Sequence, residues 1–305
     1  MKYLGGAWNV YRIKQIAYIA ICGFRRWHKN PQIILCFLMA FVFCFLLSDK
    51  VMQFAQTHGT YLQGTEAFIW TFGDAHSVFA ISILLLLLFA DMPNLSNEVP
   101  YYMIRINRQV WMAGQIVYLV FATFFFTLFV LVATILLSAV RSYPANYWSD
   151  TAAILGYSNI GENLAIPAFV KVMELTTPYV CTMHIFFLMT GYTVTMAGII
   201  LLLNLCKNNG GMIGGVIFSV FGIMMNPDII SNLFGISIER IRIANIISGW
   251  ISPLNHATYY MHSFGYDNLP KLWQSYLFFF VVSVLLFAAS LVKIKNYPFQ
   301  FTGSV

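Results

Sequence analysis

Long runs of apolar residues constrain the fold of this chain more than any other feature of its sequence. They cover residues 33–48, 69–90, 110–140, 180–205, 212–225 and 272–292. A helix needs about 20 mostly apolar residues to cross the hydrocarbon core of a bilayer. Lipid offers the backbone no hydrogen-bond partners, so these segments must be helical. The runs predict an all-α integral membrane protein with six transmembrane helices. The fifth run is the shortest, and Gly214, Gly215 and Gly222 weaken it as a simple span.

The composition agrees with lipid as the solvent of this chain. Hydrophobic residues make up 59% and charged residues 9%, with a mean hydropathy of +0.73, whereas a soluble domain carries roughly a quarter charged residues. The 17 lysines and arginines are spread along the chain and form no basic stripe, so nucleic acid is not an expected partner. The five cysteines show no CxxC or Cys/His spacing, which argues against a disulfide framework or a zinc site.

The distribution of lysine and arginine predicts how the helices are oriented. Cytoplasmic flanks of membrane helices are enriched in these two residues. With the N-terminus in the cytoplasm, the inner flanks carry a net charge of +9 and the outer flanks −3. This partition predicts a multi-pass protein with both termini cytoplasmic. Residues 141–179 and 226–271 then form two external loops.

Some apolar segments lie outside the predicted spans. In residues 1–30, tryptophan, tyrosine and isoleucine side chains are interspersed with arginine and lysine, a pattern that suits a helix lying in the membrane interface. The alternative is that residues 7–24 continue the first span, but the basic stretch at 25–31 (RRWHKNP) interrupts it. Residues 229–234 and 243–251 are apolar but too short to cross, so they fit short re-entrant external helices.

We find no motif for covalent chemistry. The sequence holds no GxxxxGK[ST] phosphate loop, HExxH or GxSxG, so we expect no enzyme, and a pump would need an outside energy source. His256 and His262 are six residues apart, which does not place them on one helical face and favours a structural role over metal binding. Asp74 and His76 are a weak candidate for a proton site, because we expect both near the outer surface, where an ionisable group costs little.

The segment 91–109, between the second and third runs, is the most informative one. It is too long for a tight turn and too polar for the bilayer. Tyr101, Ile104, Arg105 and Arg108 recur at three- and four-residue spacing, so a short amphipathic helix would present an apolar knob with a basic edge. Such a surface suits docking into a groove on a soluble partner. An ordinary interfacial loop anchored by tyrosine and arginine is the alternative.

These features resemble the permease subunits of ABC-2 type exporters, also called type V. The resemblance covers nearly the whole chain as one permease domain, residues 1–305, with an N-terminal interfacial helix, six spans, a cytoplasmic coupling helix and re-entrant external helices. It is carried by residues 97–108 (NEVPYYMIRINR), which lead into the third span through Trp111, and by residues 252–256 (SPLNH) before the last span. The loop 141–179 looks long for this family.

The resemblance implies an ATP-driven exporter in the plasma membrane of a bacterium. The permease would pair with a second copy or a similar chain, and a separate ATP-binding cassette subunit, which would hold ATP and Mg, would dock on each coupling helix. No cofactor is expected in this chain itself. The second and fifth spans would line the path, and their apolar and aromatic residues favour an amphipathic cargo such as a peptide, an antibiotic or a lipid-like molecule. The residues expected to transmit force from the ATPase are Glu98, Tyr101, Tyr102, Ile104, Arg105 and Arg108.

A membrane-embedded enzyme, or an immunity protein that acts without an ATPase, is the alternative. An enzyme should place polar catalytic residues on adjacent spans near one interface, and the predicted spans are nearly free of them. A protein acting alone would have no use for the coupling-like segment.

Overall fold

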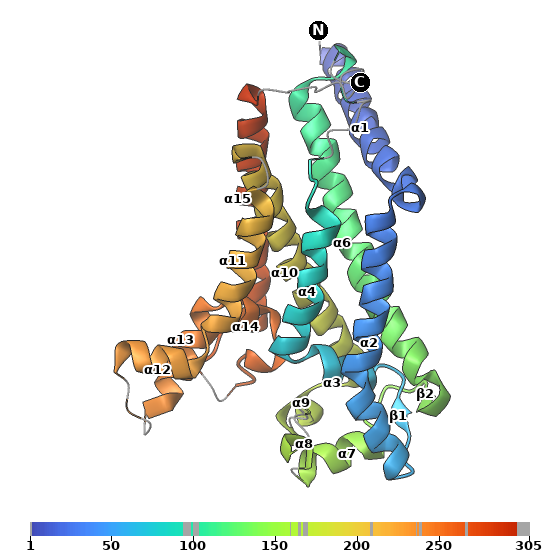
Figure 1. Ribbon diagram of the computed structural model, residues 1–305, viewed down its shortest axis with the longest axis vertical. Coiled ribbons are helices and arrows are strands. Elements are labelled where there is room, and N and C mark those ends of the chain that lie inside the picture. Colours follow the sequence, from blue (N-terminus) through green and yellow to red (C-terminus); the bar gives the residue numbers. More distant parts are fainter. Residues whose placement is uncertain are drawn as a thin grey trace.

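The computed structural model describes residues 2–93, 99, 104–158, 160–163, 166, 170–207, 210–235, 237, 240–265 and 268–297. Four helical segments are long and apolar enough to cross a membrane. They are α2 (Pro31–Thr57), α6 (Arg108–Ser138) with η2 (Ala139–Arg141), α10 (Pro178–Cys206), and α15 (Leu272–Lys293) with η5 (Ile294–Asn296). All four run along the long axis of the molecule (Figure 1). The expectation of an all-α membrane protein is confirmed at this level.

Two more spans exist only if each of two bent helix pairs counts as one. Helix α3 (Glu66–Phe72) meets α4 (Ala75–Phe89) at 86°, and α11 (Gly210–Met224) meets α12 (Pro227–Phe234) at 79°. Each break has a local cause, because the side chains of Asp74 and Asn226 cap the helices that follow them. The second predicted run is therefore not one straight helix, since its first residues belong to α3, which lies across the bundle.

The boundaries of α2 and α6 differ from the apolar runs that predicted them. Helix α2 continues past residue 48 to Thr57, and Gln53 Nε2 donates to Asp49 Oδ2 one turn earlier at 2.6 Å. Helix α6 begins at Arg108 because the Asn107 side chain accepts a hydrogen bond from the Gln109 amide at 3.1 Å. Hydropathy marks the apolar part of a helix, whereas caps and polar pairs mark its ends.

Helix α10 is the centre of the bundle. It packs against α3, α4, α6, α11 and α15, and 67% of its most apolar stretch is buried, compared with 22% for α15. The outer helices instead expose large apolar side chains such as Leu38, Phe280 and Ile217. Exposed apolar surface on this scale is rare on a monomer in water, and it agrees with lipid contact around the bundle.

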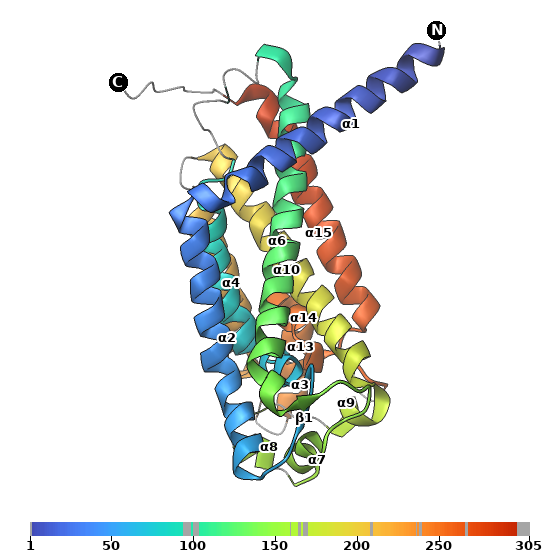
Figure 2. The ribbon, with the colours of Figure 1, turned by 90° about the vertical axis from the view of Figure 1, so that its right-hand side faces the viewer.

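The N-terminal helix α1 (Lys2–Arg25) is joined to α2 by the short helix η1 (Trp27–Lys29) and crosses α6 obliquely (Figure 2). Glycines permit the close approach of the two helices. A Cβ atom added at Gly23 would lie 2.6 Å from the Tyr118 ring, and one added at Gly114 would lie 2.6 Å from Ile19. Trp27 Nε1 also donates to the Tyr118 hydroxyl at 2.9 Å. The predicted helix in residues 1–30 is present and is attached to α6.

The two predicted external loops fold into helical lobes that lie toward the end opposite α1 (Figures 1 and 2). In the first, β1 (Leu62–Gln63) pairs in parallel with β2 (Ser142–Tyr143), followed by α7 (Asp150–Tyr157), α8 (Ile160–Asn163) and α9 (Val170–Leu175). The second contains α12, α13 (Ile241–Ile251), α14 (Pro253–Ala257) and η4 (Tyr259–Met261). The short apolar pieces at 229–234 and 243–251 are helical, as expected.

Candidate functional site

The segment between α4 and α6 is the candidate site. Residues Ile104 and Arg105 are helical, and the chain then leaves the helix at Ile106 and Asn107 before α6 begins. The expected face of one helix through Arg108 is therefore interrupted, because the Asn107 cap starts a new helix there. The other expected residues of this site, Glu98, Tyr101 and Tyr102, lie outside the described residues.

Ile104 is the apolar knob of this segment. Its side chain is 82% exposed, and Arg105 beside it is also exposed. Val99 and Met92 are buried in the core, and Ile106 packs against it. The described part of this segment thus combines buried apolar residues with one isoleucine that is largely exposed. An isolated exposed isoleucine is unremarkable, but one with an arginine beside it, close in the chain to buried residues, suits protein docking.

Arg108 has a role that the spacing pattern did not indicate. Its guanidinium donates to the backbone oxygen of Lys295 at 3.0 Å and to that of Tyr297 at 3.1 Å. The side chain therefore ties the start of α6 to the end of the last helical segment. It remains exposed, but its described contacts are within the chain.

Asn204 near the end of α10 was missed by sequence reasoning, and it joins three helix ends. Its Nδ2 donates to the carbonyl oxygens of Ala90 at 3.0 Å and Met92 at 2.7 Å, and its Oδ1 accepts from the Gly211 amide at 2.8 Å. A Cβ at residue 211 would collide with the Ile200 carbonyl and with the Asn204 side chain. The start of α11 is thus linked through Asn204 to Met92 in the candidate site. An asparagine beside an apolar run carries no signal of such contacts.

At the other end of the bundle, His256 and His262 meet at one serine of α15. Ser275 Oγ lies 2.7 Å from His256 Nδ1 and 2.8 Å from His262 Nε2. The remaining ring nitrogens face carbonyl oxygens, Trp250 for His256 and both Thr258 and Tyr259 for His262. Burial lowers the pKa of both rings, that of His262 to about 4.

This histidine pair fits the structural role favoured from the sequence. The two rings join α14 and the segment after it to the start of α15 through a shared hydroxyl. Among the described residues, no three His, Cys, Asp or Glu side chains come together as a metal site.

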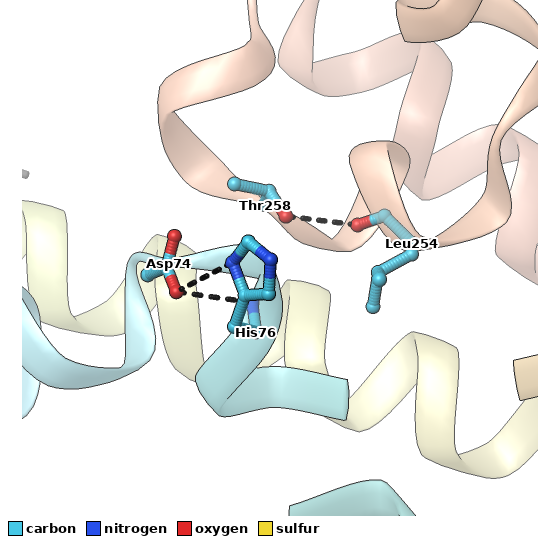
Figure 3. Close-up of polar contacts among 4 residues, drawn as sticks. All are labelled: Asp74, His76, Leu254 and Thr258. Atoms are coloured by element: carbon cyan, nitrogen blue, oxygen red, sulfur yellow. Dashed lines mark hydrogen bonds and ion pairs between the residues drawn. The ribbon is translucent and has the colours of Figure 1, made fainter. Parts of the chain in front are cut away.

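Asp74 and His76 lie at the start of α4, next to the turn that carries Leu254 and Thr258 (Figure 3). Asp74 Oδ2 accepts from the His76 amide at 3.0 Å and lies 3.4 Å from His76 Nδ1. The His76 side chain is 80% exposed. The Asp74 carboxylate acts as a helix cap, and the exposure agrees with the expected position near a surface.

Glu66 was also missed, because an acid before an apolar run reads as a surface charge. Its side chain is fully buried. Oε1 accepts from the Ser149 amide at 2.8 Å, while Oε2 accepts from the Gln63 amide at 3.1 Å and from the Ser149 hydroxyl. One carboxyl group thereby joins the start of α3 to the loop before α7.

No protein-family model, curated protein sequence or solved structure matches this chain.

Proposed function

We propose that this chain is the membrane-spanning permease subunit of an ABC-2 type, or type V, exporter that is driven by a separate ATP-binding cassette subunit. The observation that carries the proposal is the turn at Ile104 and Arg105, between α4 and α6, where both residues are exposed while Val99 and Met92 of the same segment are buried. A partner that pushes on this turn would act on two spanning helices at once. Asn204 would pass the movement to the ends of α10 and α11.

A second permease copy is the other proposed partner. Helix α11 exposes Ile213, Ile217, Phe221 and Met224. Their spacing of three and four residues places them on one helical face. Such an exposed apolar stripe suits packing against a second copy in the membrane. The apolar path between two copies would suit an amphipathic cargo.

The orientation proposed for the exporter places both termini, and the Ile104 turn, in the cytoplasm of a bacterium. Asp150 is exposed in the opposite lobe. A cysteine placed there by Asp150→Cys, in a chain whose native cysteines are replaced by serine, should react with an impermeant maleimide on intact cells. Reaction only after the cells are opened would contradict the orientation.

The docking proposal is tested by the double variant Tyr101→Ala/Ile104→Ala. It removes the apolar anchor of the interface, which should weaken ATPase binding by about 2–4 kcal/mol, or roughly 30-fold to 1,000-fold in Kd. Arg105→Ala should cost about 1 kcal/mol or less and be sensitive to salt, because a rim charge is screened. Leu233→Ala, at an exposed apolar residue of α12 in the opposite lobe, is the matched control.

The measurement is retention of the P-loop ATPase on the purified permease and its ATP turnover in nanodiscs. The double variant should insert and fold but lose both, while Leu233→Ala keeps both. If the double variant retains full complex formation and transport, the turn is an ordinary interfacial loop and the docking proposal is wrong.

A further inference from the structure

A cavity of about 310 Å³ lies where α1 crosses the ends of α2, α4 and α6. One face of α1 forms a wall of it through Tyr11, Gln15, Tyr18 and Cys22, and Arg26, which directly follows the helix, continues this wall. Their spacing of three or four residues is that of a single helical stripe. The amphipathic pattern of α1 thus has a specific use here, because the stripe lines a cavity between α1 and the ends of the other helices.

The other walls come from the ends of the spanning segments. Gln32 begins α2, Leu88 and Asp91 lie at the end of α4, and Trp111 and Gln115 are in the first turns of α6. In a spanning helix, these positions lie where the hydrocarbon core gives way to lipid headgroups. This depth follows from the ends of the apolar runs at residues 33, 90 and 110 and does not depend on which side of the membrane is cytoplasmic.

The lining combines charge, hydrogen-bond donors and apolar surface. Arg26 and Arg105 supply two positive charges and Asp91 one negative charge, and the amides of Gln15 and Gln115 add donors. Guanidinium groups bind phosphate oxygens in a planar, two-pronged geometry. Apolar side chains such as Ile19, Ile33 and Val99 form much of the remaining wall. A ligand that fits both parts has a phosphate at one end and a hydrocarbon portion at the other.

We propose that this cavity binds the headgroup of a membrane glycerophospholipid. The phosphate meets Arg26 and Arg105, Asp91 faces any ammonium group of the head, and the start of the acyl chains lies against Ile33 and Trp111. The volume is at the lower end for small-molecule sites, so it takes the headgroup while the acyl chains extend into the bilayer. The bound lipid would fasten α1 to the bundle. The inference does not depend on transport or on an ATPase partner.

Cys22 provides a direct probe, because its half-buried thiol is on the cavity wall. Cys36, Cys44 and Cys181 are buried, and the exposed Cys206 is removed by Cys206→Ser. The rate of maleimide labelling of Cys22 is then measured in maltoside micelles. Dihexanoylphosphatidylglycerol is the lipid probe. Dihexanoylglycerol, with the same chains and no phosphate, and inorganic phosphate are the comparison probes.

Only the phospholipid should protect Cys22, slowing its labelling about tenfold at a concentration near ten times its Kd. Arg26→Gln should remove this protection. Lys14→Gln removes the same charge from an exposed position on α1 outside the cavity and should leave the protection intact. Arg105→Gln is a second variant that tests the site if Arg26→Gln fails to fold, and its readout is lipid protection rather than ATPase binding.

Four results would overturn the proposal. Equal protection by dihexanoylglycerol would mean that the cavity binds the apolar part of the probe and does not recognise the phosphate headgroup. Full protection by inorganic phosphate would make it a site for small anions. Unchanged labelling in all three probes, or protection that survives both arginine variants, would mean that no phospholipid headgroup binds there.

Discussion

Replacing Glu66 with glutamine removes one of the two acceptor oxygens of a buried carboxyl group while keeping its shape. The wild-type group accepts three hydrogen bonds, two from the amides of Gln63 and Ser149 and one from the Ser149 hydroxyl. The glutamine amide has a single acceptor oxygen. If that oxygen takes the place of Oε2, it keeps two of the three bonds, and its NH₂ group then faces the Ser149 N–H, donor against donor.

The expected cost follows from that count. One buried N–H without an acceptor costs about 1–3 kcal/mol, so Glu66→Gln should weaken the junction between β1 and the loop before α7 by about that amount. Glu66→Ala removes all three acceptor contacts and should cost more. The loss is local, because the hydrogen bonds that the structure describes for the Glu66 carboxyl group go to Gln63 and Ser149. Amides around residues 62–63 and 142–149 should open more readily, while those of α10 should not.

Hydrogen exchange measured by mass spectrometry reports this local opening directly. A local loss of about 1–3 kcal/mol corresponds to exchange about 5-fold to 150-fold faster in these segments. Glu174→Gln is the matched control, because Glu174 is exposed in α9 of the same lobe. If both segments of Glu66→Gln exchange at the wild-type rate, the buried carboxyl group does not stabilise the junction between β1 and the loop before α7, and the prediction is wrong.

Three further predictions concern other parts of the bundle. Gly114→Val should overpack the crossing with Ile19 by about 1–3 kcal/mol and release α1, seen as faster exchange of residues 11–25. Asn204→Leu leaves three buried backbone groups unpaired and should speed exchange at residues 90–92 but not in α15; unchanged exchange would remove its linking role. Because burial lowers the pKa of His262 to about 4, the ring is neutral when folded and charges more readily when unfolded. The free energy of unfolding should therefore fall by on the order of 3 kcal/mol as pH drops from about 6.5 to 4. In thermal unfolding, His262→Gln should show a smaller dependence on pH than the wild type.

The local features of the fold could be read from the chain alone. Apolar runs predict helices in lipid because a helix satisfies its own backbone within the segment, with no reference to its neighbours. The same holds for residues 1–30 and for the short pieces that became α12 and α13. Caps are local as well: Asn107 and Asn226 stand directly before the helices that they start.

Only part of the candidate site could be predicted from the sequence. The exposed Ile104 and Arg105 follow from the position of a polar segment between two apolar runs. The hydrogen bonds of Arg108 to Lys295 and Tyr297 do not, because they join residues almost two hundred positions apart. The pattern of residues within one helix does not predict which distant helix ends beside it.

For the same reason, the buried polar contacts could not be predicted from the apolar pattern. Glu66, Asn204 and Ser275 look like ordinary polar residues at the edge of apolar runs, yet each is buried and joins segments that are far apart in sequence. These side chains become buried only when the helices pack, because the hydrogen-bond partners that offset the cost of burying a polar group come from other elements. The sequence by itself determined that this chain forms membrane helices and where most of them lie. Tertiary packing decided which polar groups fasten them together, because a hydrogen bond across helices depends on neighbours that no local stretch of sequence specifies.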